Sequence, residues 1–148
     1  MRFVARSAIT LAFGLALSST AWAADPFVGT WTFNKARSEV GSVNLGARVF
    51  VITGTENAQH LVQRDTLPNG TIRIVERDEI LDGKEHPGDE GTVVIARRVD
   101  AHTKTFDWTK DGRAVRAAVD TVSADGNTLT HRVTDMGRNE TRTWVFER

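Results

Sequence analysis

Three ionisable side chains in the C-terminal half of the chain could bind a charged group. Arg97, His131 and Arg142 lie in segments where polar and apolar residues alternate, a pattern typical of strands with one buried face. When the strands are paired, all three fall on that face. A guanidinium in an apolar interior requires a carboxylate, an anionic ligand or water. We therefore expect Arg97 or Arg142 to anchor an acidic group, unless each pairs within the protein or reaches solvent. His131 is either a ligand contact or a hydrogen-bonded core residue.

Four aromatic side chains share the expected buried face. They are Phe106, Trp108, Trp144 and Phe146. Large rings bury much apolar surface, so they can fill a core, and they can equally form the walls of a binding site. Both interpretations stay open at this level.

Neither catalytic nor metal-binding residues are expected. The chain has no cysteine, and its four histidines are far apart in sequence, so no zinc motif is present. The adjacent carboxylates Asp78 and Glu79 would point to opposite faces of a strand and could not share a substrate. There is no nucleophile elbow and no glycine-rich phosphate loop. We expect a protein that is not an enzyme and that has no cofactor.

Turn-forming residues divide the chain into short segments rich in Val, Ile, Thr, Phe and Trp. The strands predicted from them span 27–34, 47–53, 59–66, 71–80, 92–99, 103–110, 113–123, 128–135 and 140–147. One short helical turn is expected near 34–41, capped by Asn34. So many strands in a small domain would leave open edges unless the sheet closes. We therefore predict an all-β fold, a single antiparallel up-and-down β-barrel of about 8–10 strands.

Turn lengths fix which residues face the interior, because side chains alternate along a strand. A two-residue turn at 111–112 pairs Trp108 with Val115, and a four-residue loop at 136–139 pairs His131 with Trp144. The interior face predicted this way contains Val93, Ile95, Arg97, Val99, Phe106, Trp108, Val115, Ala117, Val119, Leu129, His131, Val133, Arg142, Trp144 and Phe146. A bulge in any strand would move part of this set to the outer face.

Residues 1–23 have the features of a cleaved signal peptide. Arg2 and Arg6 precede a short apolar run, and 21–23 form a small-residue cleavage site. The run is about half as long as a membrane span, and no cysteine follows that could carry a lipid. Residues 24–148 then contain 17 basic and 19 acidic side chains, which disfavours nucleic acid as a partner. We expect an exported, soluble protein, periplasmic or secreted, without a membrane anchor after cleavage.

The stretch "DPFVGTWTFN" places Gly29 and Trp31 on the first expected strand. Glycine permits a close backbone turn, and the indole can close one end of a barrel. The motif resembles the start of the calycins, the superfamily of lipocalins and fatty-acid-binding proteins, where Gly-x-Trp seals the barrel base under a stacked basic residue. The resemblance implies that Gly29, Trp31 and Arg148 plug the barrel, with Arg142 as the alternative basic residue. It also implies that 24–148 form one lipocalin-like domain.

The remaining motifs resemble a group of uncharacterised exported bacterial proteins of calycin-like build. They are "GTWTFNKARSEV", "DGKEHPG", "RRVDAHTKTFDWTKDGR", "VSADGNTLT" and "VFER". This resemblance implies a fold and no particular activity. Fatty-acid-binding proteins hold the ligand carboxylate with an Arg-x-Tyr motif, whose positions are occupied here by Trp144 and Phe146. The segment from Asn34 to Arg48 is also too short for their helix pair. A fatty acid is thus one candidate ligand among several.

We expect the barrel to bind a hydrophobic or amphipathic small molecule, including acidic ones, in its interior. The candidate contacts are Arg97, Phe106, Trp108, His131, Arg142, Trp144 and Phe146. The alternative is a periplasmic protein-binding module, of the protease- or lysozyme-inhibitor type, that uses loop 81–91 on a packed core. An interior cavity of about 300 Å³ or more would favour the first function, and a solid core the second.

Overall fold

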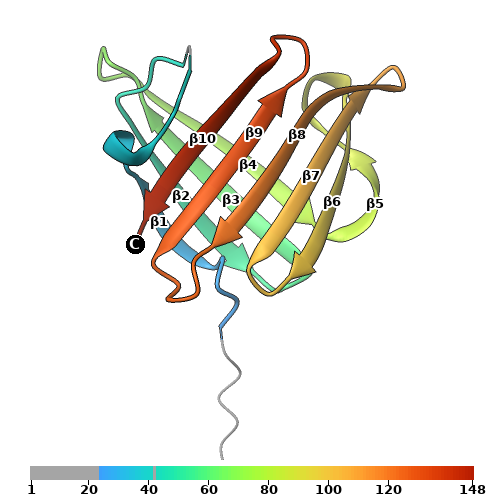
Figure 1. The fold of residues 1–148 in the computed structure, drawn as a ribbon, viewed down its shortest axis with the longest axis horizontal. Helices are drawn as coiled ribbons and strands as arrows, with labels where there is room; N and C mark the ends of the chain where they lie inside the picture. Colours follow the sequence, from blue (N-terminus) through green and yellow to red (C-terminus); the bar gives the residue numbers. More distant parts are fainter. Residues whose placement is uncertain (1–23, 42) are drawn as a thin grey trace, which may run out of the picture.

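The computed structural model describes residues 24–41 and 43–148, which form ten β-strands and two short 3-10 turns (Figure 1). The strands are β1 Gly29–Phe33, β2 Ala47–Gly54, β3 Ala58–Thr66, β4 Ile72–Ile80, β5 Asp82–Pro87, β6 Val93–Asp100, β7 Thr103–Lys110, β8 Arg113–Val122, β9 Thr128–Asp135 and β10 Glu140–Glu147. The turns are η1 Lys35–Arg37 and η2 Asp89–Gly91. The predicted signal peptide lies outside the described residues.

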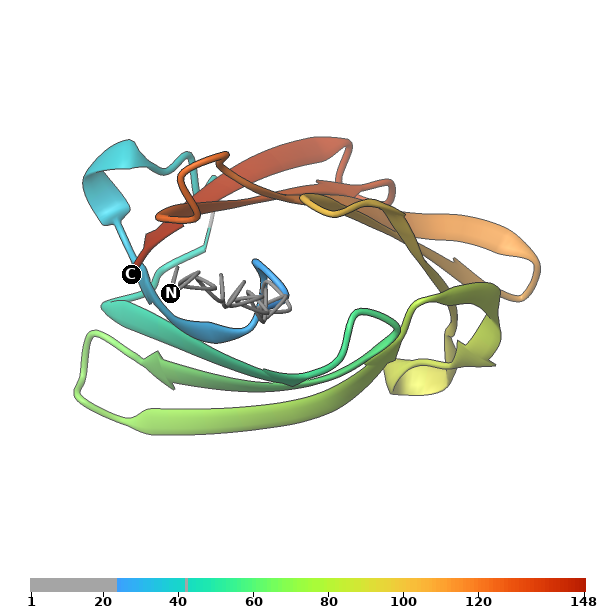
Figure 2. The ribbon, with the colours of Figure 1, turned by 90° about the horizontal axis from the view of Figure 1, so that it is seen from below.

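All ten strands belong to one antiparallel sheet in the order β4-β3-β2-β1-β10-β9-β8-β7-β6-β5. The first and last strands are neighbours, since β1 pairs with both β2 and β10. The sheet curls into a nearly closed barrel with a flattened, oval outline when seen from below (Figure 2). Within the sheet, β4 pairs only with β3 and β5 only with β6, which leaves one unpaired seam between β4 and β5. The predicted all-β, antiparallel up-and-down barrel is confirmed.

The nine predicted strands all form, and β5 is the strand that the sequence did not reveal. Its residues, "DGKEHP", include no Val, Ile, Leu or aromatic side chain, so the segment has the composition of a turn. β5 is an edge strand, and its register with β6 is irregular between Asp82 and Glu85. The expected helical turn is η1, where the Asn34 side chain accepts a hydrogen bond from the Arg37 backbone N–H at 3.2 Å.

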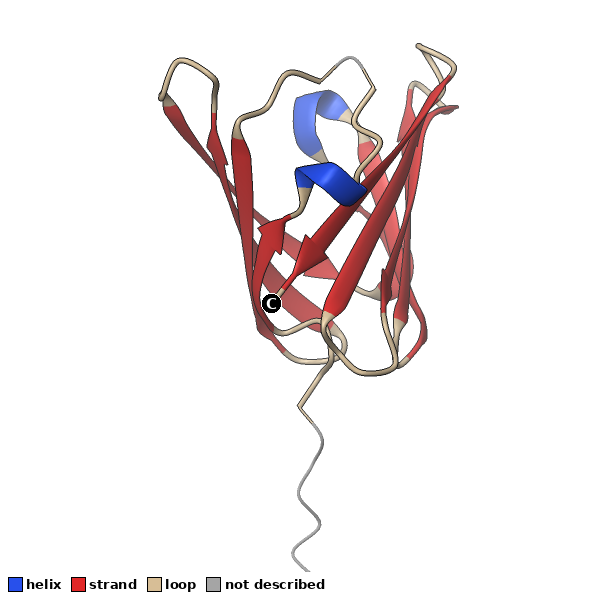
Figure 3. Ribbon diagram, turned by 60° about the vertical axis from the view of Figure 1, so that its left-hand side comes forward, coloured by secondary structure: helices blue, strands red, loops and turns tan. Residues whose placement is uncertain are grey.

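Inward-facing residues of adjacent strands lie opposite one another and form cross-strand rows. We call the end of the barrel with the β7–β8 and β9–β10 turns the mouth, and the end with residues 24–28 the base (Figure 1). Figure 3 shows the same strands from another side. The mouth row contains Val94, Trp108, Arg116 and Asp135; the middle row contains Ala96, Phe106, Ala118, Val133 and Arg142; the lower row contains Arg98, Lys104, Asp120, His131 and Trp144. These rows decide what surrounds any space inside the barrel.

The predicted register between β9 and β10 agrees with the structure, but the register between β7 and β8 does not. His131 lies opposite Trp144, as the four-residue loop required. In β8, however, the register shifts between Trp108 and Thr109, so Trp108 lies opposite Arg116 and Val115 has no partner. This bulge turns the rest of β8 over. Ala118, Asp120 and Val122 are buried inside, while the predicted interior residues Ala117 and Val119 face outward.

A second irregularity, between Arg98 and Asp100, has the same effect on β6. Ala96 faces the interior opposite Phe106, and the predicted interior residue Arg97 faces outward. Val99, also predicted to be interior, is 60% exposed. The residues that were predicted to be interior but face outward are therefore explained by two bulges, which the turn lengths alone do not reveal.

The base of the barrel is filled by Phe27 and Trp31, which are fully buried. The Trp31 indole N–H donates to the Phe27 carbonyl oxygen at 2.8 Å. The Arg148 guanidinium lies 4.4 Å from the centroid of the Trp31 ring and donates to the carbonyl oxygens of Pro26 and Val28. The resemblance to calycins implied that Arg148 stacks on the indole, with Arg142 as the alternative.

Candidate functional site

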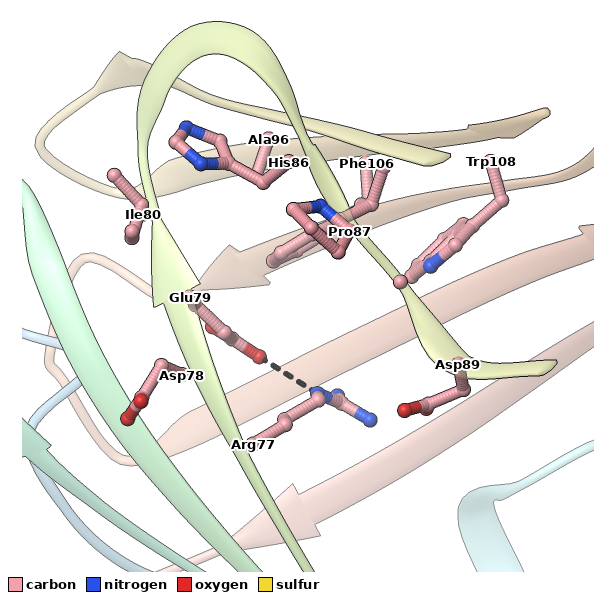
Figure 4. Close-up of a pocket in the computed structure, with 12 residues that line it drawn as sticks. Arg77, Asp78, Glu79, Ile80, His86, Pro87, Asp89, Ala96, Phe106 and Trp108 are labelled. Carbon is pink, nitrogen blue, oxygen red and sulfur yellow. Dashed lines mark hydrogen bonds and ion pairs between the residues drawn. The ribbon is translucent and has the colours of Figure 1, made fainter. Parts of the chain in front are cut away.

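A cavity of about 300 Å³ lies inside the barrel where β4, β5, β6 and β7 face one another (Figure 4). It is lined by Arg77, Asp78, Glu79, Ile80, His86, Pro87, Gly88, Asp89, Val94, Ala96, Phe106 and Trp108. Asp78 and Ile80 of β4 and His86 and Pro87 of β5 line it, so the cavity lies at the unpaired seam between these two strands. The site is therefore built on one side of the barrel and not along its axis.

Aromatic side chains form the wall of the cavity on β7. Phe106 and Trp108 are two residues apart, so they share a face of the strand, and their rings stack with centroids 5.6 Å apart. Ala96 lies opposite Phe106 on β6, and its single methyl group leaves the space in front of the ring unfilled. The wall is thus apolar and flat, and suits a hydrocarbon or aromatic group.

Polar side chains form the floor of the cavity toward the base. Lys104, in the row below Phe106, is fully buried, and its Nζ lies 2.8 Å from Glu79 Oε2 and 2.9 Å from Gln59 Oε1. Arg77 Nε donates to the other Glu79 oxygen at 3.2 Å. Lys104 and Arg77 thus share the Glu79 carboxylate, and Arg77 and Glu79 form the polar end of the cavity lining.

Asp120 and His131 form a second buried pair in the same row as Lys104. The Asp120 carboxylate hydrogen-bonds His131 Nδ1, and its other oxygen lies 3.9 Å from Lys104 Nζ. Burial raises the pKa of Asp120, but the charge and hydrogen bond of His131, with the charge of Lys104, outweigh burial and lower the pKa overall. The carboxylate is thus held ionised as part of the protein's own network.

Arg116, unlike Lys104 and Arg77, has no ion-pair partner among the described residues. Its guanidinium lies 4.4 Å from the centroid of the Trp108 ring. Its buried Nε has no hydrogen-bond partner among the described residues. Burial and the nearby charge of Arg77 lower the pKa of Arg116. Its cross-strand neighbour is Asp135. The Asp135 Oδ2 atom lies 3.9 Å from Arg138 Nε and 4.0 Å from an Arg142 Nη atom.

A second hollow of about 510 Å³ lies at the mouth, on the other side of η2 from the cavity. Its lining residues are Asp89, Glu90, Thr92, Lys110, Arg113, Ala114, Val115, Arg116, Asp135, Met136 and Gly137. Asp89 lines both spaces, and its carboxylate points toward Arg77 across the cavity (Figure 4). Arg116 lines this hollow and stacks on Trp108, which lines the cavity. It therefore lies between the two spaces.

The structure places the predicted site residues in different parts of the barrel. Phe106 and Trp108 line the cavity, while His131 lies inside the barrel on Asp120. Trp144 and Phe146 do not line the cavity; they pack with Phe33 and Phe50 in a solid aromatic cluster on the opposite side of the barrel. Arg142 faces inward, where its guanidinium lies 4.0 Å from the Asp135 carboxylate and its Nε has no partner among the described residues.

Arg97 does not face the interior, contrary to the prediction from the turn lengths. Its guanidinium is 46% exposed on the outer face and pairs with Asp107 at 2.9 Å. The register shift between Arg98 and Asp100 is the cause, because it exchanges the faces of Ala96 and Arg97.

Sequence reasoning missed Arg77, Glu79 and Arg116 as residues of the site. A signal for Glu79 was available: alternation places Asp78 and Glu79 on opposite faces, so one of these carboxylates had to face inward. Arg77 then follows, since it shares the face of Glu79. Arg116 had no such signal, because its inward position depends on the bulge at Val115.

The described residues contain no helix long and apolar enough to cross a membrane. Within 24–41 and 43–148, no group of three or more His, Cys, Asp or Glu side chains is arranged to hold a metal ion.

Comparison with known proteins shows a likeness of fold. No protein-family model and no curated protein sequence matches the chain. Among solved structures it is similar to the Schistosoma mansoni fatty acid binding protein in complex with arachidonic acid, with 13% sequence identity and a TM-score of 0.63. The match covers 83% of this chain and 96% of that protein. The chain therefore has a calycin-like barrel fold, of the kind seen in that fatty-acid-binding protein.

Proposed function

We propose that the barrel binds a hydrophobic or amphipathic small molecule in the cavity between β4 and β7. The observation that carries the proposal is the cavity itself, which has about 300 Å³, an aromatic wall of Phe106 and Trp108, and a position at the unpaired seam. Ligand sites in proteins are concave and mostly apolar, with a few polar groups, and begin at about 300 Å³. The cavity meets that description.

The same observation argues against recognition of a protein partner by loop 81–91. That segment is not a free loop: it forms β5 and η2, and His86, Pro87, Gly88 and Asp89 line the cavity. The fold likeness adds support by analogy alone, since the Schistosoma mansoni protein was solved with arachidonic acid bound.

Native mass spectrometry of the purified chain, with a panel of alkyl and aryl compounds, tests this function. We expect one bound molecule per chain. Ala96→Phe should abolish binding, because the new ring occupies the space in front of Phe106. Ala117→Phe is the matched control, since it makes the same change on the outer face of β8. If the wild type binds nothing, or if both variants bind equally, the proposed function is wrong.

We also infer that the protein acts after export. The charged start, the short apolar run and the small-residue cleavage site in residues 1–23 support this inference. The mass of the protein recovered outside the cytoplasm should correspond to a chain that begins at Ala24. Recovery of the uncleaved chain inside the cell would contradict export.

A further inference from the structure

We propose that Arg116 binds the acidic group of the ligand at the mouth of the barrel, and that the ligand is an amphipathic carboxylate of medium length. This inference rests on the proposed function, and it assigns both the chemistry and the orientation of the bound molecule. The alkyl or aryl part lies against Phe106 and Trp108, and the carboxylate lies between the cavity and the mouth.

The position of Arg116 supports a role in binding. It lies in the mouth row directly opposite Trp108, and its guanidinium stacks on the indole that lines the cavity. Stacking holds a guanidinium in one plane while leaving its N–H groups free to donate. A planar fork of donors matches the two oxygens of a carboxylate.

Acidic groups of the protein do not neutralise Arg116. No carboxylate among the described residues lies within 4.0 Å of its guanidinium, and its buried Nε is unpaired. Asp135 lies within 4.0 Å of Arg138 and Arg142, and the carboxylates of Asp89, Asp135 and Glu90 act on Arg116 only through charge at longer range. A half-buried cation without a partner gains most from an anion that arrives with the ligand.

Interior cations nearer the base are already paired, which sets the orientation of the ligand. Lys104 is held by Glu79 and Gln59, and Arg77 is held by Glu79. An acidic group placed at the floor would meet the Glu79 carboxylate. The carboxylate of the ligand therefore favours the mouth, and its apolar part fills the cavity.

The volume of the cavity limits the length of the apolar part. An apolar cavity of about 150 Å³ accommodates benzene, so by proportion about 300 Å³ accommodates a group of about twelve non-hydrogen atoms. Decanoate, whose apolar part has nine carbon atoms, lies within that limit, and 1-decanol is its uncharged counterpart. The two compounds differ at the group that Arg116 would bind.

Isothermal titration of the wild type with decanoate and with 1-decanol tests the inference. We expect decanoate to bind about tenfold more tightly than 1-decanol, the value of one charge-assisted contact. Arg116→Met keeps an unbranched side chain on Trp108 and removes the charge. It should weaken decanoate about tenfold, leave 1-decanol unchanged, and so abolish the preference. Arg116→Lys should retain part of it.

Arg97→Met is the matched control, because Arg97 faces outward on β6 and pairs with Asp107. It should leave both affinities unchanged. Equal affinity of the wild type for the two compounds would overturn the role of Arg116 while leaving the proposed function intact, and this comparison does not depend on the folding of any variant. A preference that persists in Arg116→Met would also overturn it. If neither compound binds, the proposed function fails as well.

Discussion

Lys104 and Glu79 form an ion pair inside the barrel, with 2.8 Å between Nζ and Oε2, and their side chains are 0% and 2% exposed. Lys104 belongs to β7 and Glu79 to β4, which face each other across the unpaired seam. Lys104 Nζ also lies 4.5 Å from the ring centroid of Phe27, so one side chain joins both sides of the seam to the base. The pair holds together the part of the barrel that has no ladder of backbone hydrogen bonds, and its Glu79 lines the cavity.

Lys104→Met should therefore destabilise the fold by about 3–5 kcal/mol, because it leaves the buried Glu79 without its main partner. Denaturation by urea measures the loss. The double variant Lys104→Met/Glu79→Gln should lose less than the sum of the two single variants, since neither member of the pair is then left charged without the other. Additive losses would show that the pair does not act as a unit.

Asp65 should make stability depend on pH. Burial raises its pKa, but hydrogen bonds from Arg48 and Arg73, with the charge of Arg48 and a hydrogen bond from Gln63, outweigh burial and lower the pKa overall. The carboxylate thus binds protons more weakly in the folded chain than in the unfolded chain. Its contribution is complete above the unfolded pKa of about 3.9 and is lost as pH falls through the lower, folded value.

The urea midpoint of the wild type should thus fall more steeply below pH of about 4 than that of Asp65→Asn. Asp107→Asn, an exposed change on β7, is the control and should follow the wild type. Parallel curves for the wild type and Asp65→Asn would contradict the assignment.

Arg148 should stabilise the base through its contact with Trp31. Arg148→Ala removes the stacked guanidinium and its hydrogen bonds to the Pro26 and Val28 carbonyl oxygens, for an expected loss of about 1 kcal/mol. Arg132→Ala removes an exposed arginine from β9 and serves as the reference. The measurement is the free energy of unfolding. Equal losses for the two variants would show that the indole needs no stacked cation.

Gly29 should be intolerant of a side chain for a backbone reason. Its φ is +142°, which L-residues rarely adopt, whereas the Arg148 atoms nearest to an added Cβ are at ordinary contact distances, from 3.5 Å. Gly29→Ala should thus cost about 1–3 kcal/mol of strain. Gly70→Ala is the comparison, because Gly70 also has a positive φ (+82°) but no atom lies within 4 Å of an added Cβ. A loss at Gly70 can therefore come only from backbone strain and not from crowding. A neutral Gly29→Ala would contradict this reason.

The sequence predicted the barrel because alternation and turn spacing are local properties. Nine strands and the pairing of His131 with Trp144 follow from them directly. The strand β5 was missed because its polar residues suit an edge strand and a turn equally well.

The site was harder to predict than the fold, because its residues depend on bulges. A single extra residue at Val115 brings Arg116 inside, and the irregularity before Asp100 turns Arg97 outside. Phe106 and Trp108 were placed correctly because β7 itself is regular. The cavity arises where small Ala96 faces large Phe106, a pairing that only the true register reveals.

An experimental structure of the wild-type chain with decanoate tests the central claim most directly. We expect the alkyl chain against Phe106 and Trp108, beneath the seam between β4 and β5, with its carboxylate toward Arg116. A cavity closed by side chains, or a ligand bound only on the outer face of the barrel, would contradict the account.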